Sequence, residues 1–376
     1  MKDENLVIGA GFAGATLARI LADSGEKVLV VDKRCHIGGI SYDYKDENGI
    51  TVHKYGSHIF HTQSPKVWNF LRRFGDFNTY MHRVHAIIDG IETHIPFNLD
   101  TIGDIFPNSL ANRIQEKLIS NYAYNSKIPI MEFLRQNDRD LRFLADFIYE
   151  KVFFGYSMKQ WGKSPEQLDL SVSSRIPVVV GRDPRYFTDK YQGIPISGYA
   201  RLIENMLDSP NIKLLINTDA LAVVSPSSCE NFKRVLCTGP IDEFFGYKYG
   251  PLPYRSLRFD TQSLDVEYYQ KNSVVNYPCN YDFTRIHEFK YYLDEKSPKT
   301  VICREYPEKF EMGKNERLYP EISPDTLSLY NKYARLASET SKNLFFLGRL
   351  GNYKYLDMDK SVEQAMEFLE KNCMII

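Results

Sequence analysis

Residues 5–14 read NLVIGAGFAG, and this stretch decides the fold. The apolar run 5–8 predicts a buried strand, and the spacing of Gly9, Gly11 and Gly14 predicts a tight turn that opens a helix. The first glycine permits the turn, the second lets the backbone approach a pyrophosphate, and the third lets the helix pack on the strand. The N-terminus of the helix favours phosphate, because its free N–H groups and its dipole both face the anion.

A second strand and an acid complete the motif. An amphipathic segment rich in Ala and Leu extends to Ser24, and the apolar run 28–31 ends at Asp32. An acid at this position accepts a hydrogen bond from the ribose 2′-hydroxyl of a bound dinucleotide. A glycine-rich turn without a ligand would not need the acid. The sequence therefore predicts a dinucleotide-binding unit.

A pair of glycines, Gly38 and Gly39, follows the acid and the basic Lys33 after a few residues. This arrangement resembles the second half of the fingerprint of glutathione-reductase-like flavoproteins, where the chain passes close to FAD. The resemblance favours FAD over NAD as the cofactor.

Composition limits the class of protein. The chain has 376 residues, of which 43% are hydrophobic and 25% charged, as in soluble globular proteins of two or three domains. A net charge of −1 gives no general attraction to nucleic acid or to an anionic membrane. We expect no signal peptide and no membrane span. The 6 cysteines form no metal-like cluster, so we expect reduced thiols, a cytoplasmic location and no metal site.

The remaining pattern predicts two further units. Turn dipeptides at Asn48-Gly49 and Asp89-Gly90 predict two hairpins. Apolar residues recur every three or four positions from Asp100 to Gln160 without strand runs, which predicts helices. Short alternating runs from Tyr254 to Tyr306 predict an antiparallel sheet.

Single elements complete this picture. The final helix, 357–371, is expected to return to the nucleotide unit, where its N-terminus would face the flavin. The other predicted helices are 64–75, 199–207 and 326–340, and the other predicted strands are 176–180, 212–216, 234–238 and 343–347.

The predicted fold class is α/β, with a Rossmann-like FAD-binding domain, an inserted helical domain and an antiparallel β-sheet domain. The FAD-binding domain is assigned to 1–78 plus 190–240 plus 320–376. The helical domain is assigned to 95–165. The sheet and substrate domain is assigned to 79–94 plus 166–189 plus 241–319.

Six blocks in chain order carry a more specific resemblance. They are VDKRCHIGG at 31–39; HKYGSHIFHT at 53–62; GY and KQWG within 155–162; RIP, YF and YQGIP within 175–195; TGPID and YRSL within 238–257; and TR, EYP, GRL and YKY within 284–355. Together they resemble the bacterial UDP-galactopyranose mutase family nearly from end to end.

The resemblance implies an activity. Members of the family interconvert UDP-galactopyranose and UDP-galactofuranose without net redox, with FAD that is active when reduced. The implied mechanism bonds flavin N5 covalently to the anomeric carbon while UDP leaves, so that the sugar ring opens and recloses. The resemblance also implies a UDP-hexose substrate, a homodimer and a role in cell-surface polysaccharide synthesis.

The resemblance also implies site residues. Arg175 and Arg285 match a diphosphate-binding pair, a task that suits planar bidentate donors. Tyr156 matches the ring that stacks on uracil, Trp161 lies beside the sugar, and His61 lies near the isoalloxazine with His58. The predicted catalytic residues are Arg175, Arg285, Tyr355 and His58. The predicted substrate-binding residues are Tyr156, Trp161, Arg175, Tyr186, Arg285, Tyr306, Arg349 and Tyr355. The predicted cofactor-binding residues are Gly9, Gly11, Phe12, Gly14, Asp32, Lys33, Gly39, His58, Ile59, Arg349, Asp357 and Met358.

Departures from the family pattern leave the substrate open. Ile40 stands in place of the usual Asn, Ser57 in place of Ala or Pro, and 181–185 is unusually basic; Gly351-Asn352 also differs. UDP-galactose, UDP-N-acetylgalactosamine and another nucleotide hexose all stay open. An FAD-dependent oxidoreductase and a protein that only binds FAD are the alternatives of other classes, and the Arg and Tyr set argues against both.

Overall fold

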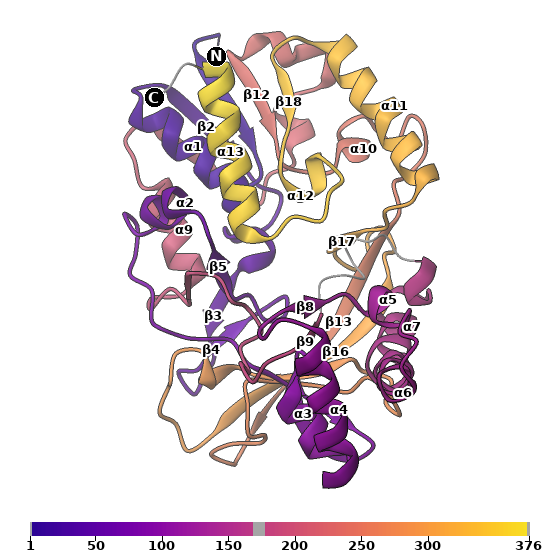
Figure 1. Ribbon diagram of the computed structural model, residues 1–376. Helices are drawn as coiled ribbons and strands as arrows, with labels where there is room; N and C mark the ends of the chain where they lie inside the picture. Colours follow the sequence, from indigo (N-terminus) through magenta and orange to yellow (C-terminus); the bar gives the residue numbers. More distant parts are fainter. Residues whose placement is uncertain (1, 168–176, 374–376) are drawn as a thin grey trace.

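The computed structural model describes residues 2–167 and 177–373, and its two main sheets lie in opposite halves of the molecule (Figure 1). The first sheet is entirely parallel and has the order β11-β2-β1-β12-β18. Its strands are β1 (Glu4–Ile8), β2 (Lys27–Val31), β11 (Ile212–Leu215), β12 (Arg234–Cys237) and β18 (Leu344–Phe346). The predicted strand, glycine turn, helix and second strand are confirmed.

Both faces of the parallel sheet are covered, because its strands are apolar on both sides. Val7 of β1 packs in one cluster with α1 (Phe12–Asp23), α9 (Tyr199–Leu207) and α13 (Met358–Cys373). Leu6 and Ile8 point to the other face and pack with Tyr333 of α11 (Pro324–Thr340). Helices α1 and α13 lie side by side in Figure 1, so the last helix does return to the nucleotide unit.

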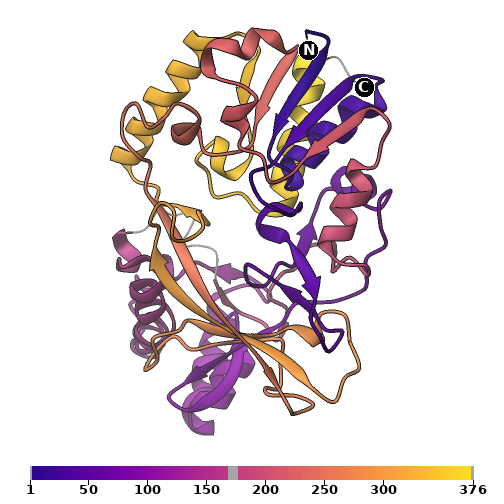
Figure 2. The ribbon, with the colours of Figure 1, turned by 180° about the vertical axis from the view of Figure 1, so that it is seen from behind.

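The second sheet contains seven strands in the order β17-β13-β16-β15-β14-β6-β7 (Figure 2). The predicted antiparallel sheet is confirmed, with one correction: β14 and β6 pair in parallel. Two strands are also longer than the short runs predicted, since β13 and β16 have 11 and 10 residues. The strands are β6 (Val84–Ile88), β7 (Ile91–Ile95), β13 (Tyr254–Leu264), β14 (Val274–Asn276), β15 (Arg285–Glu288), β16 (Thr300–Lys309) and β17 (Tyr319–Pro320).

The segment that follows β7 is largely helical, as predicted. It contains α3 (Leu99–Ile105), α4 (Asn108–Asn121), α5 (Ile130–Phe133), α6 (Arg139–Ile148), a π-helical turn (Tyr149–Phe154) and α7 (Gly155–Trp161). The expectation that it lacks strands is wrong at β8 (Lys127–Ile128), which pairs with β9 (Val178–Val179). A strand of two residues has no periodicity of its own, because only the tertiary pairing creates it.

The smaller elements follow the predicted hairpins and caps. Ser64 caps α2 through a hydrogen bond from Val67, with Pro65 at the first helical position. The elements are β3 (Asp43–Lys45), β4 (Thr51–His53), β5 (Phe60–Thr62), α2 (Pro65–Leu71), β10 (Tyr191–Gly193), α10 (Ile241–Phe244) and α12 (Gly348–Gly351). Within the described ranges, no helix has the length and apolarity needed to cross a membrane. The division into three domains stays a prediction.

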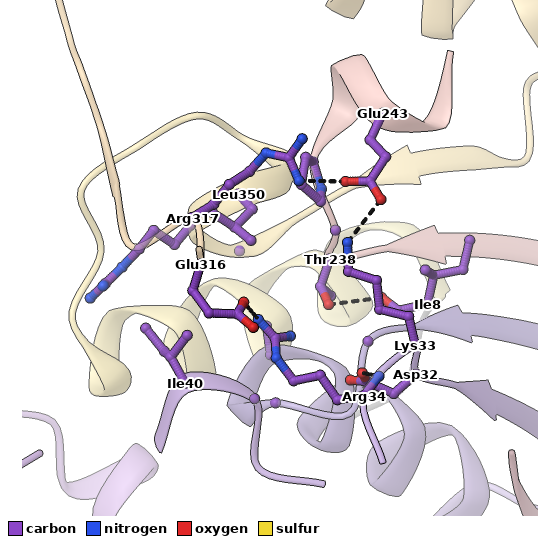
Figure 3. A pocket seen from close by; sticks show the side chains of 18 of the residues that line it. Ile8, Asp32, Lys33, Arg34, Ile40, Thr238, Glu243, Glu316, Arg317 and Leu350 are labelled. Atoms are coloured by element: carbon purple, nitrogen blue, oxygen red, sulfur yellow. Dashed lines mark hydrogen bonds and ion pairs between the residues drawn. The ribbon is translucent and has the colours of Figure 1, made fainter. Parts of the chain in front are cut away.

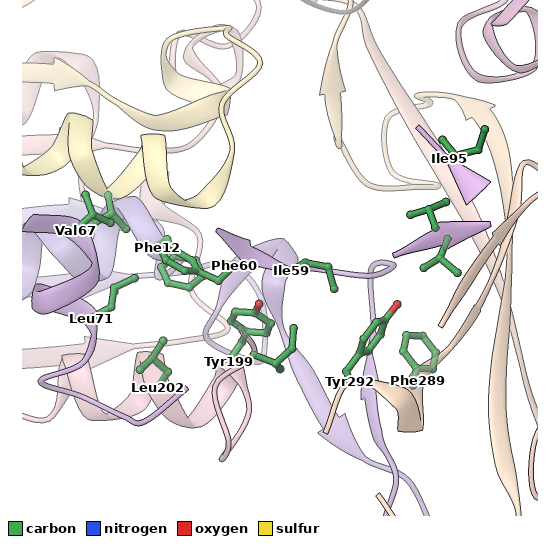
Figure 4. Close-up of a cluster of buried hydrophobic side chains, with 14 of the residues drawn as sticks. Phe12, Ile59, Phe60, Val67, Leu71, Ile95, Tyr199, Leu202, Phe289 and Tyr292 are labelled. Atoms are coloured by element: carbon green, nitrogen blue, oxygen red, sulfur yellow. The ribbon is translucent and has the colours of Figure 1, made fainter. Parts of the chain in front are cut away.

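One hydrophobic core runs across both halves (Figure 4). Phe12 of α1 packs edge-on against Tyr199 of α9, and Phe60 lies beside them. The same cluster continues through Ile59 to Tyr292, which follows β15 at the second sheet. The loop between β4 and β5 is therefore packed between the nucleotide unit and the seven-stranded sheet.

Three buried histidines predict acid-sensitive folding. Burial lowers the pKa of His53, His82 and His287, that of His82 to about 3, because desolvation disfavours the imidazolium. The unfolded chain therefore binds more protons than the folded protein as pH falls. For His82, whose pKa lies far below this interval, we expect the free energy of unfolding to fall by about 1.4 kcal/mol between about pH 7.5 and about pH 5.5, and His53 and His287 should add to the loss.

Urea unfolding of the protein at the two pH values measures this loss. His82→Gln should reduce the loss between the two pH values by about 1.4 kcal/mol. Equal or greater stability at the lower pH would contradict the prediction.

Candidate functional site

A cavity of about 690 Å³ opens where the strands of the parallel sheet end. Its walls come from the turn after β1, the ends of β2 and β12, the segment 310–317, and the start of α13. This volume is in the range of cofactor and ligand sites. The carboxyl ends of parallel strands are also where such folds bind nucleotides. The predicted cofactor residues that line the cavity are Gly9, Gly11, Phe12, Asp32, Lys33, Gly39, His58, Arg349 and Met358.

The glycines differ in what surrounds them. A Cβ added to Gly14 would lie 1.8 Å from the carbonyl oxygen of Gly9, so no side chain fits between helix and strand there. A Cβ added to Gly11 would instead meet only the backbone of Gly38 and Gly39, at ordinary distances of 3.8 to 4.0 Å. Gly14 is thus required by packing within the protein. Gly11, which lines the cavity without being crowded, leaves room for a group that approaches the backbone.

The acid and its basic neighbours form one wall of the cavity (Figure 3). The Asp32 carboxylate accepts hydrogen bonds of 2.8 Å from the N–H groups of Ala10 and Arg34. Lys33 pairs with Glu243 at 2.8 Å, and Arg34 pairs with Glu316 at 2.6 Å. Backbone N–H groups therefore hold the Asp32 carboxylate in place. The ion pair between Arg34 and Glu316 holds segment 310–317 against the nucleotide-binding motif.

The other end of the cavity lies near the first helical turn of α13. Met358 begins that helix, so its free N–H groups lie at the cavity. His58 donates from Nδ1 to the Gly56 carbonyl at 2.8 Å, and burial lowers its pKa to about 4, so the ring is neutral near pH 7. Arg349 donates from Nε to the Leu356 carbonyl at 2.9 Å. Both side chains are therefore fixed before any ligand arrives.

Aromatic rings adjoin Arg349 beyond the cavity. Its guanidinium carbon is 5.3 Å from the Tyr355 ring centroid and 5.6 Å from that of Tyr319. Tyr319 stacks on Tyr355 at 5.4 Å, and Trp161 of α7 approaches Tyr319 at 6.0 Å. Three residues predicted to bind substrate, Trp161, Arg349 and Tyr355, thus come together through Tyr319.

Arg285 joins the same region from β15. Its Nη2 donates to the hydroxyl of Tyr156, and its Nε lies 3.3 Å from Oε1 of Glu305 on β16. Burial raises the pKa of Tyr156, so its phenol stays neutral. Tyr186 and Tyr319 are close enough to contribute to the electrostatic environment of Arg285. The site thus holds two fixed guanidinium groups among tyrosines, next to a dinucleotide cavity.

The chain matches two family models. The UDP-galactopyranose mutase model covers residues 151–355, and the NAD(P)-binding Rossmann-like domain model covers residues 7–74. The chain is 38% identical over 373 residues to a probable UDP-galactopyranose mutase of Klebsiella pneumoniae, covering 98% of this chain and 94% of that protein.

The chain belongs to the UDP-galactopyranose mutase family.

The chain is also similar to a second curated relative and to a solved structure. The chain is 37% identical over 368 residues to a dTDP-fucopyranose mutase of Escherichia coli, covering 96% of each. A crystal structure of reduced UDP-galactopyranose mutase superimposes with a TM-score of 0.74 at 16% identity, covering 100% of this chain and 95% of that one. Members of the family therefore carry names with different nucleotides and different sugars.

For several predicted site residues, the structure gives a different position or no description. Arg175 falls outside the described residues. Tyr306 lies on β16 next to Glu305, so its side chain points to the opposite face of the sheet, where the Arg258 guanidinium carbon is 3.8 Å from its ring centroid. His61 stacks on Phe187 at 3.7 Å. Gly14, Ile59 and Asp357 do not line the cavity.

Their positions have physical reasons. Gly14 is buried beneath the turn, and Ile59 belongs to the hydrophobic core. Asp357 precedes α13, and its carbonyl accepts hydrogen bonds from the backbone and the hydroxyl of Ser361. Arg182 and Arg185 of the basic stretch form ion pairs with Asp100 and Asp183 and keep side-chain exposures of 54% and 39%.

The sequence analysis missed Tyr319, assigned no role to Glu305, and overlooked the wall formed by segment 310–317. Tyr319 is one of 26 tyrosines and belongs to a strand of two residues, so nothing local marks it. Only the pairing of β17 with β13 brings it to Tyr355. Glu305 gave a signal that could have been used, because an acid at a buried strand position requires a cationic partner.

Two alanine substitutions separate the cofactor role of the motif from its packing role. Gly11→Ala should fold normally but lose most of its bound flavin, since the new methyl group occupies space in the cavity and meets protein atoms only at ordinary contact distances. Gly14→Ala should lower the melting temperature of the apoprotein strongly, because its methyl group meets the Gly9 carbonyl. Flavin absorbance per protein and thermal melting measure both effects. Full flavin content in Gly11→Ala would contradict the assignment of the cavity.

Proposed function

We propose that this protein is a flavin-dependent mutase that interconverts the pyranose and furanose forms of a nucleotide hexose, with UDP-galactose as the first candidate. The observation that carries the proposal is the position of Arg285 and Arg349. Both guanidinium groups lie among tyrosines, Arg349 in the lining of the dinucleotide cavity and Arg285 in the aromatic region next to it. An oxidation site for an amine or a carbon acid would not need two cations for a diphosphate.

FAD suits the cavity on the chemistry of its lining. The Gly11 and Gly39 backbone leaves space for a pyrophosphate, Asp32 can accept from a ribose hydroxyl, and the α13 N-terminus favours the negative charge of a reduced flavin. When bound and reduced, the cofactor would supply the nucleophile for the anomeric carbon.

The protein's own residues would hold the leaving group. A diphosphate that departs and returns must stay bound while the sugar ring opens and recloses. Arg285 and Arg349 offer planar donors fixed by Glu305 and by backbone carbonyls, so they need no reorganisation when the charge develops. The rings of Tyr156, Tyr355 and Trp161 would bind the base and the sugar and exclude water.

His58 would contribute as a neutral group. Its Nδ1 donates to a backbone carbonyl, which leaves Nε2 as a hydrogen-bond acceptor near pH 7. An acceptor beside the cofactor can orient a hydroxyl or an N–H group. We assign it no role as an acid.

A second candidate has its own support. The chain is 37% identical in sequence to a dTDP-fucopyranose mutase and 38% identical to the Klebsiella relative, so the two identities are nearly the same. The same mutase chemistry on a dTDP-sugar is therefore the main alternative, followed by UDP-N-acetylgalactosamine. The proposal also includes a cytoplasmic location, which the free thiols of the described cysteines support, and a homodimer, which stays a prediction.

The decisive experiment uses anaerobic, dithionite-reduced protein. UDP-galactofuranose, its N-acetylated analogue and the dTDP-linked furanose of fucose are offered in turn, and products are separated by anion exchange. We expect conversion to the pyranose only when the flavin is reduced, and fastest with UDP-galactofuranose. Loss of all three conversions in protein that keeps a reducible flavin would refute the proposal.

Arg285 provides a sharper test. Arg285→Ala should retain flavin and lose at least about a thousandfold in kcat/KM, because a charge-paired diphosphate contact disappears from the site. Arg304→Ala is the matched control on the adjoining strand, where Arg304 pairs with Asp260 at 3.6 Å. Near-normal turnover in Arg285→Ala would remove Arg285 from the mechanism.

A further inference from the structure

A chain of hydrogen bonds that ends in an ion pair lies behind Arg285. Arg285 on β15 and Glu305 on β16 are directly opposite each other in the antiparallel ladder. His287 follows two residues after Arg285, so both point to the same face of the sheet. His287 Nε2 lies 3.0 Å from Glu305 Oε2, while Oε1 of the same carboxylate faces Arg285. One carboxylate thus connects the histidine to the arginine.

The chain continues from His287 to the loop after β4. His287 Nδ1 lies 2.5 Å from the Ser57 hydroxyl, and that hydroxyl also contacts the hydroxyl of Tyr292. Ser57 is one of the positions where the sequence departs from the family pattern. The departure thus coincides with a specific contact to His287.

Only one direction of donation satisfies every group. Burial of Glu305 opposes ionisation, but the Arg285 charge and the His287 hydrogen bond outweigh it and lower its pKa to about 2. An ionised carboxylate can only accept, so His287 donates from Nε2 and its Nδ1 accepts from Ser57. The Tyr292 hydroxyl then donates to Ser57. Each link fixes the tautomer or rotamer of the next.

The arrangement is buried and closely packed. The side chains of His287 and Glu305 are only 1% and 5% exposed. A Cβ added to Gly56 would lie 2.9 Å from Phe259 Cε1 and 3.4 Å from Glu305 Oε2, so the loop backbone rests directly against the pair. The same loop then carries His58 into the cofactor cavity. The loop that brings His58 to the cavity is therefore packed directly against the network that ends at Arg285.

We propose that His287, oriented by Ser57, is a positioning residue that holds Glu305 so that Arg285 keeps its guanidinium directed toward the substrate diphosphate. The inference rests on the proposed function, because it takes Arg285 as a diphosphate ligand. Without the His287 donor, Oε2 of the buried carboxylate turns to the nearest remaining cation, which is Arg285. The pair then becomes bidentate and withdraws the guanidinium from the ligand.

The test measures binding of UDP to oxidised, flavin-loaded protein by calorimetry, so it does not depend on turnover. His287→Phe, which keeps the ring but loses both hydrogen bonds, should weaken UDP binding about tenfold with unchanged flavin content. His287→Gln keeps one donor and one acceptor and should restore most of the affinity. Ser57→Ala should weaken binding about threefold. His85→Gln, in a histidine–carboxylate pair on the β6–β7 hairpin, should leave the affinity unchanged.

A double-mutant cycle identifies the route of the effect. In an Arg285→Ala background, His287→Phe should weaken UDP binding no further, because the histidine acts through the arginine. Equal losses in both backgrounds would overturn the proposal and assign His287 a general structural role. Unchanged or tighter UDP binding by His287→Phe would also overturn it.

The outcomes separate this inference from the proposed function. A parent protein that does not bind UDP contradicts UDP as the ligand, and the series is then repeated with dTDP. A parent that binds UDP through Arg285, but is insensitive to His287→Phe, refutes only the positioning role.

Discussion

The contact between Gly14 and the Gly9 carbonyl is the constraint on which the rest of the structure depends. Helix α1 lies so close to β1 that a Cβ at Gly14 would overlap the carbonyl oxygen. This approach fixes the turn, directs the N-terminus of α1 at the cavity, and leaves the Gly11 backbone uncovered. The parallel sheet, α13 and the opposite wall of the cavity are all packed around that turn. The candidate dinucleotide site therefore exists because Gly11 and Gly14 carry no side chains.

The candidate substrate site depends on the positive charges of Arg285 and Arg349, which are largely shielded from solvent in and beside that cavity. Arg285 and Arg349 are held by Glu305 and by backbone carbonyls among aromatic rings. A cation in such surroundings interacts strongly with a diphosphate, since little water screens it. It also needs an anionic counterpart when no ligand is present. Glu305 meets this need for Arg285, and His287 and Ser57 keep that carboxylate in one orientation.

Membership of the family indicates the type of reaction more precisely than it indicates the substrate. Relatives of nearly equal similarity are named for UDP-galactopyranose and dTDP-fucopyranose. Guanidinium groups among tyrosines suit the diphosphate that UDP- and dTDP-sugars share, which is why we propose this region as the diphosphate site. The departures from the family pattern at Ile40, Ser57 and 181–185 leave the preferred sugar open.

The sequence by itself determined the nucleotide fold and most of its elements. Periodicity and turn chemistry act over a few residues, so residues 5–14, Asp32, the hairpin turns and the Ser64-Pro65 cap could be recognised locally. Only the tertiary structure decided that β14 pairs in parallel with β6, and that Tyr319 rather than Tyr306 lies against Tyr355. Both results depend on strand pairing between distant segments, and one position along a strand moves a side chain to the opposite face. The link from Ser57 to Arg285 has the same origin: it joins residues from three separate segments, and their hydrogen bonds exist only once the core has brought those segments together.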